Sequence, residues 1–227
     1  MITYLKIFLI AVYCLIIAIL TIIVSPIDSK GKTVHQLSKI FATGILFIAN
    51  VKIQLKGIER LNPSETYIIV SNHLSLFDIP ILMRCIPNNL RFIYKKSLTN
   101  IPIFGWAMYL GKYIPIDRKD GRSALKSLRE AVRYIRKGIS VSIFPEGTRS
   151  KDGTMGEFKK GTFVLADEAL VKIVPVTIIG TNKLMSKNKL KINPGSAKVI
   201  IHNPLEFKKD KNFLNEIREI ITSGYLK

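Results

Sequence analysis

Two apolar patterns occupy the N-terminal part of the chain. Residues 7–24 read IFLIAVYCLIIAILTIIV and carry no charge. As a helix this run would measure about 27 Å at 1.5 Å per residue, close to the roughly 30 Å of a hydrocarbon core. In the next segment, 33–51, apolar residues recur at spacings of three and four, which predicts an amphipathic helix. The members of this stripe are Val34, Leu37, Phe41, Ile45 and Ile48.

We therefore expect residues 1–50 to form a membrane-binding helix pair. A hairpin that dips into one leaflet and a single span followed by a juxtamembrane helix both fit the pattern. A secretory signal peptide is disfavoured, because Lys6 is the only early positive charge and no small-residue cleavage site follows the apolar run. Lys30, Lys32 and Lys39 could meet lipid headgroups. We expect His35, which lies among polar residues of the second helix, to face solvent.

From residue 52 onward, short apolar runs alternate with helical periods, which favours an α/β domain over 51–227. A basic amphipathic helix is predicted between residues 122 and 136, and a closing helix at 212–221. The segment 189–202 predicts two strands around the turn residues Asn193, Pro194 and Gly195. The other predicted strands lie at 66–72, 91–95, 112–116, 139–144 and 172–179.

Composition limits the classes of partner that this chain could bind. Lys and Arg number 35 against 16 Asp and Glu, a net charge of +19, while 48% of the residues are hydrophobic. This hydrophobicity excludes a disordered chain, and the positive field favours phosphates or an anionic membrane surface. Two cysteines do not suggest a disulfide framework or a metal site, so we expect a cytosol-facing domain. A membrane-tethered nucleic-acid binder would explain the charge, but no motif of that class is present.

A histidine and an aspartate follow the first strand of this domain. The stretch SNHLSLFD places His73 five residues before Asp78. Residues five apart do not share a face of a regular helix, so the two side chains can pair only across a strand-to-helix turn. A carboxylate bonded to one ring nitrogen fixes the tautomer and leaves the other nitrogen to act as a general base. A helix-capping histidine is the structural alternative.

Two further loops at strand ends carry groups suited to phosphate. PEGTRS follows the strand at 139–144: Gly147 lets the backbone approach a ligand, and Arg149 offers a guanidinium fork. Another strand ends in Asp117 and Arg118. A catalytic base beside phosphate-binding cations would result if the three loops met.

The blocks NHLSLFD, IPIDR, FPEGTRS and VPV together resemble the glycerolipid acyltransferase family. The resemblance extends from residue 52 to 205, and the helix pair at 1–50 is similar to the membrane-binding motif of a bacterial branch. It implies a mixed, largely parallel sheet flanked by helices. One departure is Ser97, where many members carry glutamate.

The resemblance also implies roles. The reaction would move an acyl chain from a thioester, acyl-coenzyme A or acyl carrier protein, to the sn-2 hydroxyl of lysophosphatidic acid, without a metal or other cofactor. The enzyme would work on membrane lipids at the cytoplasmic face of a bacterial inner membrane, as a monotopic or single-span protein. Other acceptors remain open: a lyso-ornithine lipid, a lysophospholipid or glycerol-3-phosphate. The implied assignments are His73 as base, Asp78 as its orienter, Lys95 and Arg118 at the acceptor phosphate, Glu146, Gly147, Thr148 and Arg149 at the acceptor site, and Val174, Pro175 and Val176 near the acyl donor.

Three other side chains carry weaker signals. His202 has no acidic neighbour before Glu206, and we expect it to be structural. Trp106 and Tyr109 follow Gly105 and could face an acyl chain, the membrane interface or the core.

Overall fold

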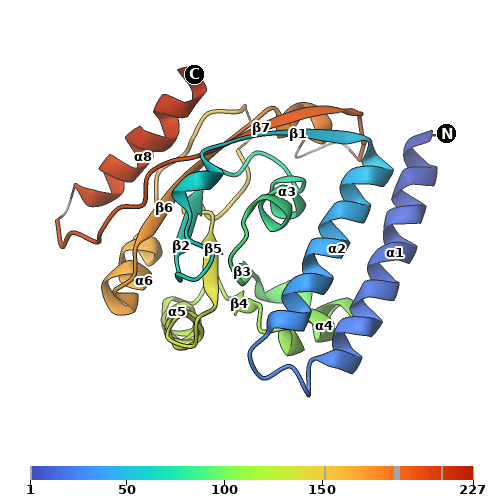
Figure 1. Cartoon of the computed structure of the whole chain (residues 1–227), viewed down its shortest axis with the longest axis horizontal. Helices are drawn as coiled ribbons and strands as arrows, with labels where there is room; N and C mark the ends of the chain where they lie inside the picture. The colour runs from blue at the N-terminus through green and yellow to red at the C-terminus, as the bar shows by residue number, and fades with distance from the viewer. Residues whose placement is uncertain (1, 151, 187–189, 211, 227) are drawn as a thin grey trace.

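A twisted sheet forms the centre of the computed structural model, which describes residues 2–150, 152–186, 190–210 and 212–226 (Figure 1). Within these residues the strand order is β1-β7-β6-β2-β5-β3-β4. Only β6 and β7 pair antiparallel. The prediction of a mixed, largely parallel sheet is therefore confirmed. The strands are β1 Val51–Lys56, β2 Ile68–Ser71, β3 Leu90–Lys95, β4 Ile114–Ile116, β5 Ser140–Ile143, β6 Ile173–Ile179 and β7 Gly195–Ile201.

Helices cover both faces of the sheet (Figure 1). One apolar core lies between the sheet and α2 with α3, and a second lies between the sheet and α5, α6 and α8. The α-helices are α1 Ile2–Val24, α2 Lys32–Ala49, α3 Asp78–Cys85, α4 Phe104–Leu110, α5 Gly121–Ile135, α6 Gly161–Ala169, α7 Thr181–Leu184 and α8 Phe213–Ser223. Short 3-10 helices are η1 Ile58–Arg60, η2 Lys96–Asn100 and η3 Gly224–Leu226.

The basic amphipathic helix forms as the sequence predicts. Asp120 caps the start of α5 by accepting a hydrogen bond from the Arg122 N–H at 3.0 Å. Its apolar stripe, which includes Leu128, Val132 and Ile135, is buried against the sheet. The closing helix α8 is likewise present.

The first two helices form an antiparallel hairpin beside the sheet domain (Figure 1). Lys6 donates to the Ala49 carbonyl at 3.1 Å, and the Tyr13 hydroxyl donates to the Ile40 carbonyl at 2.7 Å. By length and composition, Thr3–Val24 of α1 could cross a membrane, with a mean hydropathy of 3.2. The helix packs against α2 and against α4.

A buried arginine fixes the loop of this hairpin to the sheet domain. The fully buried Arg91 of β3 donates to the Gly31 carbonyl at 2.8 Å and also bonds the Gly111 carbonyl. Lys112 donates to the carbonyl oxygens of Asp28 and Ser29 at 2.7 and 2.6 Å. The hairpin is therefore held at a set position relative to the sheet.

Two strand assignments from the sequence need correction. Residues 190–192 form no strand, and Lys189 lies outside the described residues. Conversely, β1 was not predicted as a strand. The two errors have one cause: β1 occupies the position beside β7, in parallel register from Val51 opposite Gly195, where a hairpin partner would have paired.

The prediction that His35 faces solvent is wrong. Its side chain is 5% exposed, with Nε2 lying 3.3 Å from the Pro87 carbonyl and Nδ1 accepting the Leu90 N–H at 3.4 Å. Burial, followed by the charges of Lys39 and Arg91, lowers the pKa of His35 from 6.5 to about 4. Amphipathic spacing missed this, because the second face of α2 packs on the loop before β3.

This buried histidine predicts a loss of stability in mild acid. The folded state favours the neutral imidazole, so the unfolded state binds more protons between pH 6.5 and 4 and stability falls as the pH drops through that window. Between pH 7 and 5, the wild-type chain should lose about 2 kcal/mol of unfolding free energy more than His35→Gln. Denaturant unfolding at both pH values measures this. Identical pH dependence in the two proteins would contradict the assignment.

Candidate active site

The predicted site residues gather at one edge of the sheet. Strands β2, β5, β3 and β4 are consecutive neighbours and all run parallel, so their carboxyl ends share an edge. His73 follows β2, Glu146 follows β5, Lys95 ends β3 and Arg118 follows β4. The sheet order thus places a histidine, a carboxylate and two cations at one edge of the sheet, although they lie far apart in the sequence.

His73 and Asp78 pair across the turn from β2 into α3. The distance from His73 Nδ1 to Asp78 Oδ2 is 2.8 Å, and Asp78 is the first residue of α3. Because the carboxylate can only accept, Nδ1 carries the hydrogen and Nε2 is left as the acceptor nitrogen. The imidazole stacks on Phe144, with ring centroids 3.9 Å apart and an angle of 11° between the planes. Ring orientation and tautomer are both set before a substrate binds.

The Asp78 carboxylate is fully buried and accepts four hydrogen bonds. Besides His73, the backbone N–H groups of Leu74 and Ser75 donate to Oδ2 at 2.7 and 2.8 Å. The Thr181 hydroxyl donates to Oδ1 at 2.6 Å. Sequence reasoning missed Thr181, which lies 103 positions away in the chain and reaches the site because β6 neighbours β2.

Replacing this threonine should weaken the pair without removing it. Thr181→Val keeps the shape but leaves Oδ1 without its donor, a loss of about 1–3 kcal/mol of stability for a buried acceptor. We expect turnover to fall about tenfold, equivalent to roughly 1.4 kcal/mol of barrier, with the Michaelis constants unchanged. The matched variant Thr181→Ser keeps the hydroxyl and should stay near wild type. Steady-state kinetics of both variants decide the matter, and equal turnover in the two would rule out this role.

Further contacts hold the backbone of the turn. The His73 N–H donates to Glu146 Oε1 at 2.8 Å, while Glu146 Oε2 accepts the Gly156 N–H at 2.9 Å. Asn72, fully buried, bonds both the N–H and the carbonyl of Ile178 at 2.8 Å and donates to the Tyr225 hydroxyl. Glu146, assigned to the acceptor site from the resemblance, thus uses both carboxylate oxygens to fix backbone next to the histidine.

The remaining predicted site residues lie at the same edge of the sheet. Arg118 Nη1 donates to the carbonyl of Gly147, whose φ of 69° suits a residue without a side chain. Lys95 and Thr148 are exposed, and Arg149 is half-buried. A Cβ atom on Gly147 would lie 3.0 Å from Lys159. This lysine, which the sequence pattern did not indicate, therefore lies beside the predicted site residues. Among the described residues, no group of three or more His, Cys, Asp or Glu is placed to hold a metal ion.

The valine–proline–valine block lies inside the sheet. Val174, Pro175 and Val176 lie in β6, opposite Ile69, Val70 and Ser71 of β2, and the two valines are fully buried in the core. Because β6 pairs with β2, the strand that leads into the histidine turn, this block helps to hold that turn in place.

An apolar cavity of about 470 Å³ is lined in part by Leu76 and Phe77, which lie between His73 and Asp78 in the turn. The Phe144 ring that stacks on His73 lies 6.1 Å from the ring of Phe92, which lines the cavity. From there the cavity runs between the helical hairpin, α3 and α4. Its walls are almost wholly hydrocarbon, a lining suited to an alkyl chain. Typical lining residues are Ile10, Cys14, Phe41, Pro80, Met83 and Met108.

Comparisons with known proteins agree with this geometry. Residues 52–179 match the family model described as Acyltransferase. A chloroplastic 1-acyl-sn-glycerol-3-phosphate acyltransferase of Arabidopsis thaliana is 41% identical over 197 residues, 86% of this chain and 55% of that protein. The alpha form of 1-acyl-sn-glycerol-3-phosphate acyltransferase from Homo sapiens is 28% identical over 194 residues, 85% of this chain and 69% of that protein. The chain spans about half the length of the plant and algal relatives that it matches.

A solved structure is similar over nearly the whole chain. The crystal structure of the 1-acyl-sn-glycerophosphate acyltransferase from Thermotoga maritima superposes with a TM-score of 0.84 at 26% identity. The alignment covers 98% of this chain and 94% of that one, so it includes the N-terminal hairpin as well as the sheet domain.

Proposed function

We propose that this chain, which belongs to the acyltransferase family, transfers an acyl group from an acyl thioester to the sn-2 hydroxyl of lysophosphatidic acid, giving phosphatidic acid. The observation that carries the proposal is the oriented His73–Asp78 pair, which has cations of neighbouring strand ends at the same edge of the sheet and an apolar cavity beside its turn. The cations suit the phosphate of the acceptor, and the cavity suits the acyl chain of the donor.

The histidine is the general base of the proposed reaction. Nε2 of His73 takes the proton from the acceptor hydroxyl as its oxygen attacks the thioester carbonyl. The tetrahedral intermediate then collapses with cleavage of the carbon–sulfur bond, and the imidazolium returns the proton to the leaving thiolate. The buried carboxylate of Asp78 stabilises the transient imidazolium and keeps the ring in place. Proton, acyl group and thiol balance without an added cofactor.

The cations support a phosphate-bearing acceptor. Lys95, Arg118 and Arg149 lie at or after the carboxyl ends of β3, β4 and β5, and Lys159 lies against Gly147. A guanidinium can bind phosphate oxygens with two hydrogen bonds. The Gly147 turn carries its carbonyl to Arg118 and thereby orients that side chain. We assign these groups to the acceptor phosphate, and the Thr148 hydroxyl to the same rim.

The cavity provides the site for an acyl chain. A fatty chain bound between α1, α2 and α4 would remain in hydrocarbon surroundings while its reacting end reaches the histidine. Val174 and Val176 belong to the same apolar core as Phe92 and Met83, which line the cavity, so a place for this block near the donor stays a prediction. The donor is acyl-coenzyme A or acyl carrier protein.

The hairpin would bind one face of a membrane, the cytoplasmic face of a bacterial inner membrane, without crossing it. Lys39 and Arg84 line the same surface groove as Tyr13, which lies at the middle of α1. If α1 crossed the bilayer, these two charges would lie near its centre, at a cost of several kcal/mol. The monotopic arrangement keeps them at the headgroups and leaves lysolipid and product in one leaflet.

The test is a comparison of acceptors under one set of conditions. Initial rates would be measured with lysophosphatidic acid, glycerol-3-phosphate, lysophosphatidylcholine and a lyso-ornithine lipid. We expect lysophosphatidic acid to give the highest kcat/KM, because it alone joins an uncapped phosphate monoester to a single chain. A higher kcat/KM with either of the other lipids or with glycerol-3-phosphate would reassign the acceptor while leaving the base in place.

A further inference from the structure

The segment from Ser97 to Leu110 differs from the rest of the chain. It reads SLTNIPIFGWAMYL and contains no charged residue, whereas 22% of the whole chain is charged. It forms η2 and α4, and several of its large apolar side chains are exposed at the surface. Trp106 is 57% exposed and Tyr109 is 58% exposed, and Leu98, Ile101 and Leu110 are exposed as well.

These side chains are held outward by a rigid support. The buried face of α4 carries Gly105 and Ala107. A Cβ atom on Gly105 would collide with backbone oxygens of η2, so only glycine permits this close packing of the two elements. The Tyr94 hydroxyl also hydrogen-bonds the Thr99 hydroxyl at 3.0 Å. The exposed aromatic residues therefore project from two elements that are packed closely against each other.

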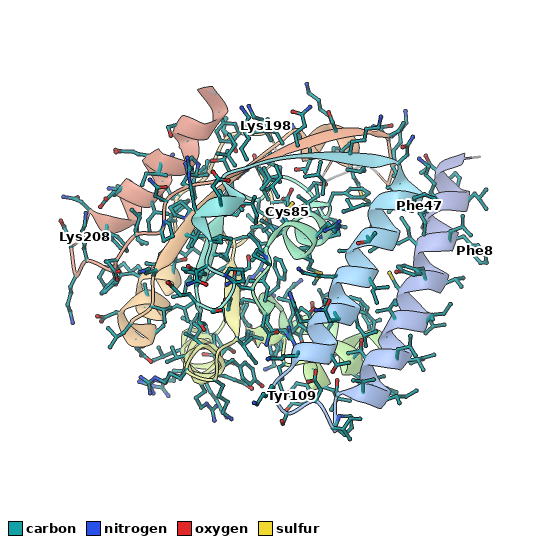
Figure 2. All side chains as sticks on the ribbon, in the orientation of Figure 1. Phe8, Phe47, Cys85, Tyr109, Lys198 and Lys208 are labelled. Atoms are coloured by element: carbon teal, nitrogen blue, oxygen red, sulfur yellow. The ribbon has the colours of Figure 1, made fainter. Side chains whose placement is uncertain are left out.

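The surface continues onto the outer side of α1. Helix α4 packs along α1, and Gly111 at its end lies against Thr21 and Val34 of the hairpin. On α1 the outward side chains are all apolar or aromatic, among them Phe8 and Leu15. Figure 2 shows Phe8 pointing away from the domain and Tyr109 at its lower margin.

We propose that η2 and α4 form a second membrane contact, with Trp106 and Tyr109 seated among the lipid headgroups beside α1. This inference extends the membrane association of the proposed function. A lipid bilayer fits better than a protein partner for two reasons. Trp and Tyr are the side chains that favour the boundary between headgroups and hydrocarbon, and the uncharged run is preceded directly by the exposed Lys96.

The contact would place the mouth of the cavity in the leaflet. Leu98, Phe104 and Met108 of this segment line the cavity together with Ile10 and Cys14 of α1. Both walls at that end thus come from elements that touch lipid. An acyl chain would pass between leaflet and cavity without crossing water.

Trp106 is the sole tryptophan of the chain, so its fluorescence reports this contact directly. The full chain would be reconstituted in nanodiscs of phosphatidylglycerol and phosphatidylcholine, with bromine placed either near the headgroup or near the end of the acyl chain. We expect strong loss of Trp106 emission with the shallow bromine and less with the deep one. Emission equal to that in unbrominated nanodiscs would overturn the proposal.

A relocated tryptophan provides the control. In the double variant Trp106→Phe, Phe207→Trp, the reporter moves beside Phe163 and Phe213, in the core that faces α8 rather than the hairpin. Its emission should not respond to bromine at either depth. Because this readout needs no turnover, it stays valid even if the acceptor assignment fails.

An activity comparison tests the consequence. Trp106→Glu should lower the rate on long-chain lysophosphatidic acid presented in vesicles, and Trp106→Phe should lower it less. Neither variant should change the rate on a short-chain acceptor that dissolves as monomers. An equal loss on both substrates would show that Trp106 acts inside the site, against the proposed contact.

Discussion

His73→Ala is expected to lower kcat by about 100-fold to 10,000-fold, the range for loss of a general base. The expectation rests on geometry. Asp78 occupies Nδ1, so Nε2 is the nitrogen that can take the acceptor's proton, and alanine leaves no group in its place. Turnover under saturating donor and acceptor measures the effect.

The variant should keep its fold, because the backbone contacts at this position remain. The His73 N–H bonds Glu146 and its carbonyl accepts the Ser150 N–H at 2.8 Å, and neither needs the side chain. Circular dichroism and thermal unfolding serve as controls. If a folded variant retained wild-type kcat, His73 would have no part in the chemistry.

Asp78→Asn should lower kcat strongly, but by less than the roughly 10,000-fold found where the amide of a His–Asn pair also imposes the wrong imidazole tautomer. The amide can turn its oxygen toward the three donors at Oδ2, and its NH₂ toward Thr181, whose hydroxyl can accept instead. The shape of the turn is thus preserved while the charge that stabilises the imidazolium is lost. Steady-state kinetics should show the loss in kcat, with little change in the Michaelis constants.

Asp117→Asn is the matched control for this charge. Asp117 lies at the same edge of the sheet but is half-exposed, and it caps the Lys119 N–H and pairs with Lys96 at 3.8 Å. Such a surface pair contributes less than about 1 kcal/mol, so near wild-type turnover is expected. A comparable loss in both variants would show that the net charge at this edge of the sheet, and not the orientation of the histidine, controls turnover.

The local pattern of the chain predicts the parts of the site that lie close in sequence. A strand followed by a polar turn places His73 against Asp78, and the same reading applied to PEGTRS and IPIDR places Gly147 and Arg118 at strand ends. Parallel neighbouring strands bring their carboxyl ends together, so the grouping of these residues at one edge follows once the sheet order is known.

Contacts between distant elements could not be predicted in this way. Thr181 reaches Asp78 only because β6 lies beside β2, and the cavity exists only because α1 and α4 pack side by side. The pairing of β1 with β7 displaced an expected hairpin, and the packing of α2 buried His35. In each case the local pattern sets the element, whereas tertiary packing sets its partner.

The central claim is acyl transfer to lysophosphatidic acid. The most direct measurement uses the purified chain in liposomes with a long-chain acyl-coenzyme A as donor, and in parallel with an acylated acyl carrier protein. Free thiol and phosphatidic acid would be followed together, with and without lysophosphatidic acid. We expect thiol release that requires the acceptor and matches phosphatidic acid one to one with at least one donor. Thiol release at the same rate without acceptor, or no phosphatidic acid with either donor, would contradict it.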